Sequence, residues 1–381
     1  MGIATCYSIK LEIYNHQEQK TCTFAHIIQF FKTEKEIQVF IMTNKTKKIL
    51  SIAGASLIII LAIAYWLFFS SFSSNSKPSF VYIDKDDTTD SVFVKVEKAA
   101  HPRQTIGLKI CSALFGYSTH IHAGRYSTGN GISTLSLMRN LRGGRQSAVS
   151  LVIPVVHTMD NLAARLSDQL EVDSTTLSNC FKDSVLLKHL DVDTATIACL
   201  FLPNTYEVYW DITPQKLLKR MKKEHDAFWT SKRTKQASEA GLTPDEVYTL
   251  ASIVEQESAN EKERPMIAGM YLNRLHQGMK LQADPTVKFA LKNFTLRRIM
   301  LNHLSVNSPY NTYQHEGLPI GPICIPSLNA IESVLHYVHH NYLYMCAKED
   351  FSGTHNFAAT YTEHTANAKR YADALNKKGI N

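Results

Sequence analysis

An uncharged run of 21 residues, 49–69, constrains this chain more than any other feature of its sequence. A helix of that length crosses the ~30 Å hydrocarbon core of a bilayer. A short leader with three lysines, 42–48, comes directly before it, and lysines that flank a membrane helix are retained in the cytoplasm. We therefore predict an uncleaved transmembrane helix over 49–69, a cytoplasmic basic leader over 42–48, and the rest of the chain outside the cytoplasm.

A cleaved signal peptide is the rival interpretation of this run. The run is long for the apolar part of a signal peptide, and no clear small-x-small cleavage site follows it. We also hypothesise that Met42 is the true start and that the upstream extension 1–41 is a misreading, which an intact mass including it would contradict. After the run, the serine-rich segment 70–79 is predicted to be a polar tether.

The composition is that of a folded protein and excludes several classes of function. The 381 residues can hold about two domains besides these N-terminal segments. The net charge of +7 comes without a dense stripe of Lys and Arg, so no nucleic-acid partner is expected. Seven cysteines occur without a Cys-x-x-Cys pair, which argues against a zinc site and a dense disulfide framework. Their odd number leaves at least one thiol free.

From residue 80 to 147 the sequence predicts a small α+β unit of ordinary domain size. Apolar alternation indicates strands and apolar spacing of three to four residues indicates helices. The elements expected here are strands at 80–83 and 91–96, a helix over roughly 100–115, a turn at 123–126, and a helix over 132–141 capped by Ser133 and ended by Gly143 and Gly144.

Residues 148–381 are predicted to form a second, mainly helical domain with some strands. Its first part alternates short extended and helical segments. These are a strand at 150–156, a helix that starts at Thr158, a helix over 175–190, a loop at 202–206, an extended segment at 208–210, and a helix that starts at Thr213 and Pro214.

The helix that follows carries the strongest candidate for a catalytic group. Thr243, Pro244 and Glu246 form a helix start with a capping box, and apolar residues then mark one helical face up to Val254. Glu257 continues this inward face, where desolvation and the negative helix end both raise the pKa of a carboxylate. Such a group could act as a protonated acid. Glu255 points to another side and is expected to be solvated.

A structural alternative for Glu257 is a buried ion pair with an arginine such as Arg264. Two more helix starts follow in the sequence. Residues 260–263 match a capping box for a helix that ends at Gly278, and Asp284 precedes a proline as the cap of the next helix.

Several short sequence motifs in this region occur in the same order as in a known protein family. The sequence resembles the YceG-like family from about residue 80 to 371, most densely over 243–326. One departure occurs near residue 153, where the family often has Pro-Glu-Gly and this chain has Pro154 followed by two valines. The matching strings are AGRY at 123–126, LPNTY at 202–206, EQE at 255–257, ER at 263–264, YLNRL at 271–275, LQADPTV at 281–287, YNTY at 310–313, GLPIGP at 317–322 and HNF at 355–357 with His364.

The resemblance implies a LysM-like subdomain over 80–147 and a mainly helical, lysozyme-like catalytic domain over 148–381. It implies that Glu257 is the acid of a lytic transglycosylase that cuts the MurNAc–GlcNAc β-1,4 bond inside peptidoglycan strands. Most glycosidases need two carboxylates. Here the muramyl C6 hydroxyl would replace water as the nucleophile and leave a 1,6-anhydro end, so one group could serve as acid and then as base.

Other residues of the matching strings are candidates for binding the saccharide. Gln282 and Asn273 could hydrogen-bond sugar hydroxyl or acetamido groups, or could be polar core residues. Tyr310, Asn311 and Tyr313 could line a groove by stacking and hydrogen bonding, or could serve only to pack a loop.

Four alternatives to this function are considered at the level of sequence. A non-catalytic peptidoglycan-binding anchor would not need the inward Glu257, and a hydrolytic muramidase would use water where the transglycosylase uses the C6 hydroxyl. A metal-dependent hydrolase has no His-Glu-x-x-His motif to support it, and a serine hydrolase has no Gly-x-Ser-x-Gly. No metal or other cofactor is expected. The histidines considered for a metal site are His336, His339, His340, His355 and His364.

The resemblance also implies a location and partners. The protein would be a single-pass protein of the bacterial inner membrane with its catalytic domain on the periplasmic side. It would end the elongation of nascent glycan strands there. Besides peptidoglycan strands and the membrane, its partners would then include the cell-wall synthesis machinery.

Overall fold

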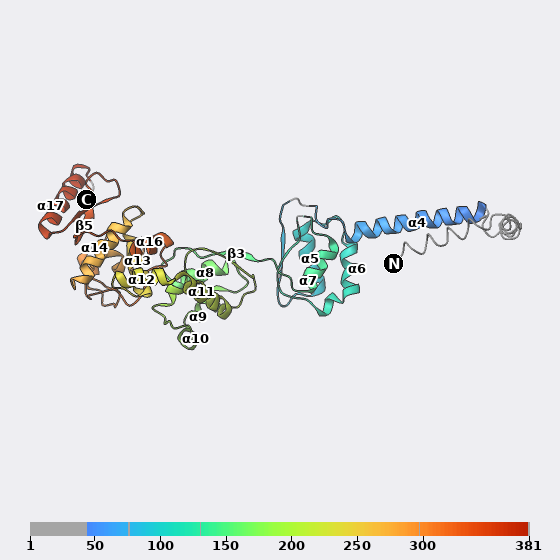
Figure 1. The fold of residues 1–381 in the computed structure, drawn as a ribbon, viewed down its shortest axis with the longest axis horizontal. Helices are drawn as coiled ribbons and strands as arrows, with labels where there is room; N and C mark the ends of the chain where they lie inside the picture. Colours follow the sequence, from blue (N-terminus) through green and yellow to red (C-terminus); the bar gives the residue numbers. More distant parts are fainter. Residues whose placement is uncertain (1–43, 75–76, 130, 297, 380–381) are drawn as a thin grey trace, which may run out of the picture.

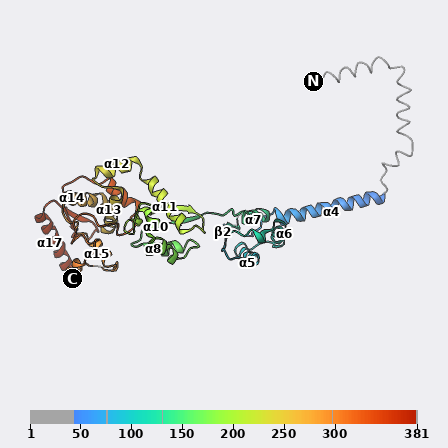
Figure 2. The same cartoon turned by 90° about the horizontal axis from the view of Figure 1, so that it is seen from below.

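The computed structural model describes residues 44–74, 77–129, 131–296 and 298–379. It is an extended chain of units, with one long helix at one end and three packed units following in sequence order (Figures 1 and 2). The upstream extension 1–41 and the start proposed at Met42 lie outside the described residues. Each unit contains helices and one two-stranded antiparallel sheet, so the described structure is mainly helical with few strands.

The long helix is α4, Asn44–Phe68. Within it, 46–68 is long and apolar enough to cross a membrane, and its most apolar 18 residues are not buried in the protein, whereas Phe68 at its end packs against the N-terminal unit. The helix begins inside the predicted leader and ends one residue before the predicted end of the span. A long apolar helix that is exposed over most of its length is unfavourable in water, so its surface fits a lipid environment.

The N-terminal unit is built around a core that extends from Phe72 to Leu141. Strand β1 pairs antiparallel with β2, with Val81 opposite Tyr126. Helices of the unit pack against this hairpin and bury Val92, Val96 and Leu137 in the core. The elements are β1 Phe80–Ile83, α5 Thr89–Ala100, α6 Ile106–Phe115, η1 Tyr117–Thr119, β2 Gly124–Ser127 and α7 Thr134–Arg142.

Two predictions for this unit are wrong. The segment 91–96, predicted as a strand, lies in helix α5, because Thr88 and Ser91 form a capping box and the buried residues Val92 and Val96 are four apart. The spacing of these valines fits both the two-residue period of a strand and the 3.6-residue period of a helix. The capping box at Thr88 favours the helix. The predicted turn at 123–126 is instead largely strand β2. The helix capped by Ser133 and ended at Gly143 is confirmed.

The predicted tether is not a free linker over its described residues. The Phe72 side chain is buried in the core of the N-terminal unit. The backbone N–H of Phe72 donates to the carbonyl of Ile132 at 2.8 Å, and the Phe72 carbonyl accepts from Arg103 at 3.0 Å. Residues 70–74 therefore attach the end of α4 firmly to this unit.

The middle unit has its own core, with β3 and β4 antiparallel and Leu151 opposite Tyr206. The helix predicted over 175–190 is two short helices, because Asp173 and Asp183 cap separate starts. The predicted strand at 150–156 stops at Val152, just before Pro154. The elements are β3 Val149–Val152, α8 Met159–Ser167, α9 Ser174–Cys180, α10 Ser184–Lys188, η2 Ile197–Leu200, β4 Thr205–Val208 and α11 Pro214–Phe228.

The C-terminal unit is organised around α13, Pro244–Glu257. Every residue from Val247 to Val254 is buried, and α14, α15 and α16 pack around this helix. The Tyr248 hydroxyl donates to the Phe201 carbonyl at 2.6 Å and ties α13 to the middle unit. The remaining elements are α12 Ser231–Glu239, α14 Arg264–His276, α15 Asp284–Ala290, η3 Leu301–Ser305, α16 Leu328–Leu335, β5 Tyr344–Ala347, β6 His355–Ala358 and α17 Tyr361–Lys377.

Candidate active site

The site lies at the C-terminal end of α13. The predicted helix start is confirmed, since Thr243 and Glu246 form the capping box and Pro244 is the first residue of the helix. Val247, Leu250 and Val254 are buried as predicted. Glu257 is the last residue of the helix, where its carboxylate meets the negative end of the backbone dipole.

The side chain of Glu257 lines a cavity of about 220 Å³. The cavity is open on one side and is formed by α13, α14, the start of α15, the loop before it, the 310–313 loop and β5. Polar groups predominate around the carboxylate, as expected for a site that binds a hydroxyl-rich ligand. The lining residues are Glu257, Met270, Tyr271, Arg274, Leu281, Gln282, Asp284, Tyr313 and Met345.

Glu257 is held in place by Tyr271 of α14. The Tyr271 hydroxyl donates to Oε1 of Glu257 at 2.6 Å. Burial is the largest influence on the carboxyl group and raises its pKa from 4.5 to about 7, the Tyr271 hydrogen bond lowers it in part, and the charge of Asp284 raises it. The proton on Glu257 is therefore retained up to near-neutral pH, as an acid catalyst requires.

Asp284 brings a second carboxylate to the same cavity. The Tyr313 hydroxyl donates to its Oδ1 at 2.6 Å. The prediction that Asp284 caps a helix is wrong, because Asp284 is already the first residue of α15 and the cap position is Ala283, with no side-chain cap. Each carboxylate of the cavity thus accepts a hydrogen bond from one tyrosine. Burial raises the pKa of both Tyr271 and Tyr313, so both hydroxyls keep their protons.

Arg274 lines the cavity but is engaged by the backbone. Its guanidinium donates to the carbonyl of Leu343 at 2.6 Å and to the carbonyl of Leu281 at 2.8 Å. It therefore fixes the loop before α15 against β5. Gln282 in that loop has a positive φ of 52° and donates its backbone N–H to the Thr312 carbonyl at 3.1 Å. The exposed Gln282 side chain is presented at the rim of the cavity.

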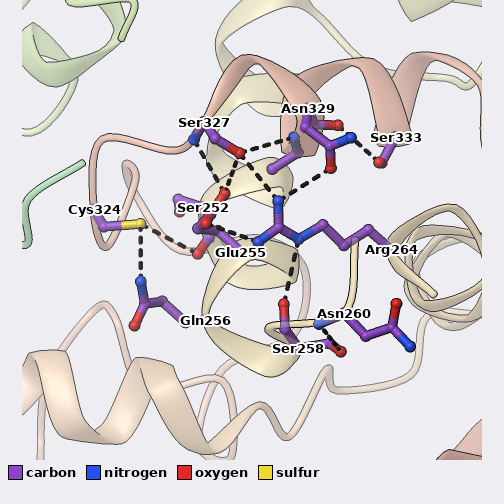
Figure 3. Close-up of polar contacts among 11 residues, drawn as sticks. Ser252, Glu255, Gln256, Ser258, Asn260, Arg264, Cys324, Ser327, Asn329 and Ser333 are labelled. Carbon is purple, nitrogen blue, oxygen red and sulfur yellow. Dashed lines mark hydrogen bonds and ion pairs between the residues drawn. The ribbon is translucent and has the colours of Figure 1, made fainter. Parts of the chain in front are cut away.

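Glu255, two residues before Glu257, has a different role from the one predicted. It is not solvated, because its carboxylate pairs with the buried Arg264 at 2.9 Å and accepts the backbone N–H of Ser327 at 3.1 Å (Figure 3). The arginine also donates to Asn329 at 3.0 Å. The ion pair considered for Glu257 is thus made by Glu255, and it ties α13 to α14 and α16.

The predicted capping box at 260–263 is wrong. Glu263 occupies the cap position of α14 but makes no side-chain cap bond. Its carboxylate instead accepts the backbone N–H of His355 at 2.7 Å and lies 3.0 Å from Nδ1 of the His355 imidazole ring. This pair holds β6 against the start of α14. This pair therefore fixes the position of His355, which lowers the pKa of Glu257 electrostatically.

The predicted binding residues divide into two groups. Gln282 and Tyr313 line the cavity with Glu257. Asn273 donates to the carbonyls of His340 and Tyr342 at 2.7 and 3.0 Å. Asn311 is buried and its amide donates to the carbonyls of Leu304 and Val306, and Tyr310 packs on Phe289. Asn273, Asn311 and Tyr310 therefore stabilise the backbone and the core, and none of the three lines this cavity.

A separate, smaller hollow of about 60 Å³ is lined by residues that the sequence did not single out as candidates. Gln256 and Pro285, which line it, are each next in sequence to a carboxylate residue of the Glu257 cavity. His157 stacks on Phe294 with ring centroids 4.2 Å apart, which forms a flat aromatic wall. The hollow combines residues from 157 to 323, a separation that no local pattern could reveal. Its lining residues are His157, Gln256, Pro285, Lys288, Phe294 and Ile323.

Three of the five histidines considered for a metal site, His336, His340 and His355, make polar contacts with other protein groups. His336 contacts Gln236 and Glu332 on the surface, and His340 contacts the Met266 carbonyl. Within the described ranges, no group of three or more His, Cys, Asp and Glu side chains is arranged to hold a metal ion.

We expect Glu257→Gln to stabilise the protein at alkaline pH. The folded state binds more protons than the unfolded state between pH 4.5 and about 7, so stability falls over that window as pH rises. Removing the carboxylate should raise the free energy of unfolding by roughly 1–3 kcal/mol above pH 7 and leave it unchanged below pH 4. Denaturant unfolding at pH 4, 6 and 8 measures this difference, and an equal effect at all three would contradict it.

Glu255→Gln is the matched comparison and should have the opposite effect. It leaves Arg264 buried without its anion, which should destabilise the protein by about 3 kcal/mol. The same unfolding experiments check this value. An unchanged midpoint for Glu255→Gln would show that the ion pair does not hold α13, α14 and α16 together.

Comparison with known proteins gives a consistent result. The model of the YceG-like family matches residues 81–370. The chain is 26% identical over 272 residues to a Bacillus subtilis protein named endolytic murein transglycosylase, covering 67% of this chain and 74% of that one. A Streptococcus pneumoniae protein of the same name is 28% identical over 291 residues, covering 67% of this chain and 52% of that protein.

A solved structure supports the fold. The crystal structure of a yceG-like protein from Listeria monocytogenes superposes with a TM-score of 0.51 at 24% identity, covering 77% of this chain and 99% of that one. At this identity the likeness extends to the fold and not to the chemistry.

Proposed function

The chain belongs to the YceG-like family, and on this premise we propose that it is an endolytic murein transglycosylase. It cleaves the MurNAc–GlcNAc β-1,4 bond inside peptidoglycan strands and leaves 1,6-anhydro-MurNAc ends. The names of the two relatives support the reaction. The observation in this chain that carries the proposal is Glu257, a carboxyl group with a pKa of about 7 in a polar cavity.

In the proposed mechanism Glu257 acts first as an acid. Its proton goes to the oxygen that bridges MurNAc C1 and GlcNAc C4, the C1–oxygen bond breaks, and positive charge develops on the muramyl ring. The ionised Glu257 then takes the proton of the muramyl C6 hydroxyl while the C6 oxygen bonds to C1. The proton is returned to the enzyme, so no water is consumed, and Tyr271 holds the carboxylate in position for both steps.

Asp284 contributes in this scheme as a fixed negative charge. It lines the same cavity, raises the pKa of Glu257 and faces the region where positive charge develops. Tyr313 and Gln282, also in the cavity, are our candidates for hydrogen bonding to the sugars. Asn311 supports Tyr313, because its Oδ1 accepts the backbone N–H of Tyr313 at 3.0 Å.

The presence of Asp284 also favours a second candidate, a hydrolytic muramidase on the same fold. Glycosidases that use water generally place two carboxylates in one site, as this cavity does. The two functions differ in one product, because hydrolysis leaves a reducing MurNAc end and transglycosylation an anhydro end.

The proposed setting is the bacterial inner membrane. Helix α4 is the single-pass anchor, the leader is cytoplasmic, and the three units lie in the periplasm near newly made glycan. In this setting the N-terminal unit corresponds to a LysM-like subdomain over 80–147, and the lysozyme-like catalytic domain extends over 148–381. Cleavage there would terminate nascent strands, in partnership with the cell-wall synthesis machinery.

We expect Glu257→Gln to abolish glycan cleavage. The amide keeps the size of the side chain but has no proton to give at neutral pH, so the rate should fall by at least about 10³-fold. The full chain in detergent micelles is incubated with uncrosslinked glycan strands, and the released ends are identified by mass spectrometry.

Glu261→Gln, at an exposed position four residues later, is the control and should cleave normally. Anhydro ends from the unchanged protein and from this control, but not from Glu257→Gln, support the proposal. Anhydro ends from Glu257→Gln would refute the role of Glu257, and reducing ends from the unchanged protein would favour the muramidase.

The rate of cleavage should decline as the pH rises through about 7. Only the protonated form of Glu257 can act as the acid, and its pKa of about 7 sets the point at which half of that form is lost. A profile of kcat/KM against pH from 5 to 9 measures this limb. A rate that keeps rising up to pH 9 would contradict an acid role for this carboxyl group.

Tyr271→Phe should move that limb to higher pH. The lost hydrogen bond normally stabilises the carboxylate, so its removal raises the pKa of Glu257 further. A purely structural tyrosine would change the height of the profile without moving it. The pH profile of Tyr271→Phe beside that of the unchanged protein separates these outcomes.

A further inference from the structure

Helix α6 of the N-terminal unit exposes an apolar stripe that the protein itself does not cover. Ile106, Ile110 and Leu114 are 62%, 38% and 74% exposed. They are four residues apart and therefore lie on one face. The opposite face carries Leu108 and Cys111, which are buried in the core of the unit. An apolar face of this kind on a surface helix indicates a binding partner with an apolar surface.

The stripe begins at the end of the membrane helix. Gln104, just before α6, donates from Nε2 to the carbonyl of Leu67 in the last turn of α4 at 2.9 Å. A Cβ atom at Gly107 would collide with that same carbonyl, so only glycine permits this approach. The first turn of α6 is therefore packed against the point where α4 ends.

The orientation of α6 relative to α4 also fits a bilayer surface. Helix α6 runs crosswise to α4, on the side of the N-terminal unit from which α4 leaves (Figure 1). The view turned by 90° again places it on that side (Figure 2). If α4 crosses the bilayer, α6 lies along its surface. Because Phe72 fixes residues 70–74 to the unit, this arrangement does not depend on a loose linker.

The charges around the stripe are those expected for contact with lipid headgroups. Lys109 is exposed between Ile106 and Ile110. Arg103 is exposed just before the helix, and the exposed Arg142 donates to the carbonyl of Phe115 at the other end at 2.6 Å. The helix itself contains no acidic residue. Basic residues that flank an apolar stripe are typical of helices that lie on anionic bilayers.

We propose that α6 is a second membrane contact, lying in the interface of the outer leaflet with Ile106, Ile110 and Leu114 among the acyl chains and its basic residues among anionic headgroups. This proposal rests on the membrane span proposed for α4 and not on the chemistry at Glu257. Two contacts, one through the bilayer and one along it, hold the N-terminal unit in a fixed orientation. The units that carry the Glu257 cavity then extend away from the membrane.

The test places a photo-crosslinking amino acid at single positions of the full chain, reconstituted in vesicles of phosphatidylglycerol and phosphatidylethanolamine. Position 114 probes the stripe. Position 59, in α4, is the control for insertion, and position 185, in α10, is an exposed apolar position in the middle unit. All three side chains are exposed, so replacing them leaves the cores intact. After illumination, mass spectrometry identifies lipid adducts.

The proposal predicts lipid adducts at positions 59 and 114 and none above background at 185. Adducts at 59 but not at 114 would overturn it. A crosslink from 114 to a second copy of the chain in place of lipid would also overturn it and assign the stripe to a dimer. No adduct at 59 would refute the membrane span itself, and with it the proposal, whatever the glycan-cleaving activity.

Discussion

The site depends on the desolvation of one carboxyl group at the end of a buried helix. Residues Val247 to Val254 of helix α13 are buried among neighbouring elements. This packing fixes the position of the final turn of the helix. Glu255 and Glu257 share this turn but differ in their partners. Glu255 meets Arg264 and is neutralised as an ion pair, whereas Glu257 meets a tyrosine hydroxyl and a second carboxylate and retains its proton instead.

The surrounding structure maintains the different environments of Glu255 and Glu257. Arg264 and Ser327 connect α13 to α14 and α16, which fixes the helix end that carries both glutamates. Arg274 and the positive φ of Gln282 fix the loop that brings Asp284 beside Glu257. The three units follow one another away from α4, so the proposed anchor and the cavity lie at opposite ends of the described chain (Figure 1).

Local signals in the sequence were enough for the helix starts with strong caps and for the membrane-length helix. Thr243 with Glu246 and Ser133 both cap as predicted, because a cap acts within one turn. The sequence alone could not decide between strand and helix at 91–96, where valines fit both periods. It also predicted a solvated Glu255 and considered Arg264 as a partner only for Glu257, since the contact of Glu255 with residues 264 and 327 is made by tertiary packing. The His157–Phe294 stack is long-range in the same way.

The most direct measurement of the central claim is the ionisation of Glu257 itself. Infrared difference spectra of the full chain, with Glu257→Gln subtracted, isolate the carbonyl stretch of this one protonated carboxyl group across pH 4 to 9. We predict a band that persists through pH 6 and disappears around pH 7, in agreement with the raised pKa of Glu257. A band lost near pH 4.5 would show a solvated carboxylate and would contradict Glu257 as the acid.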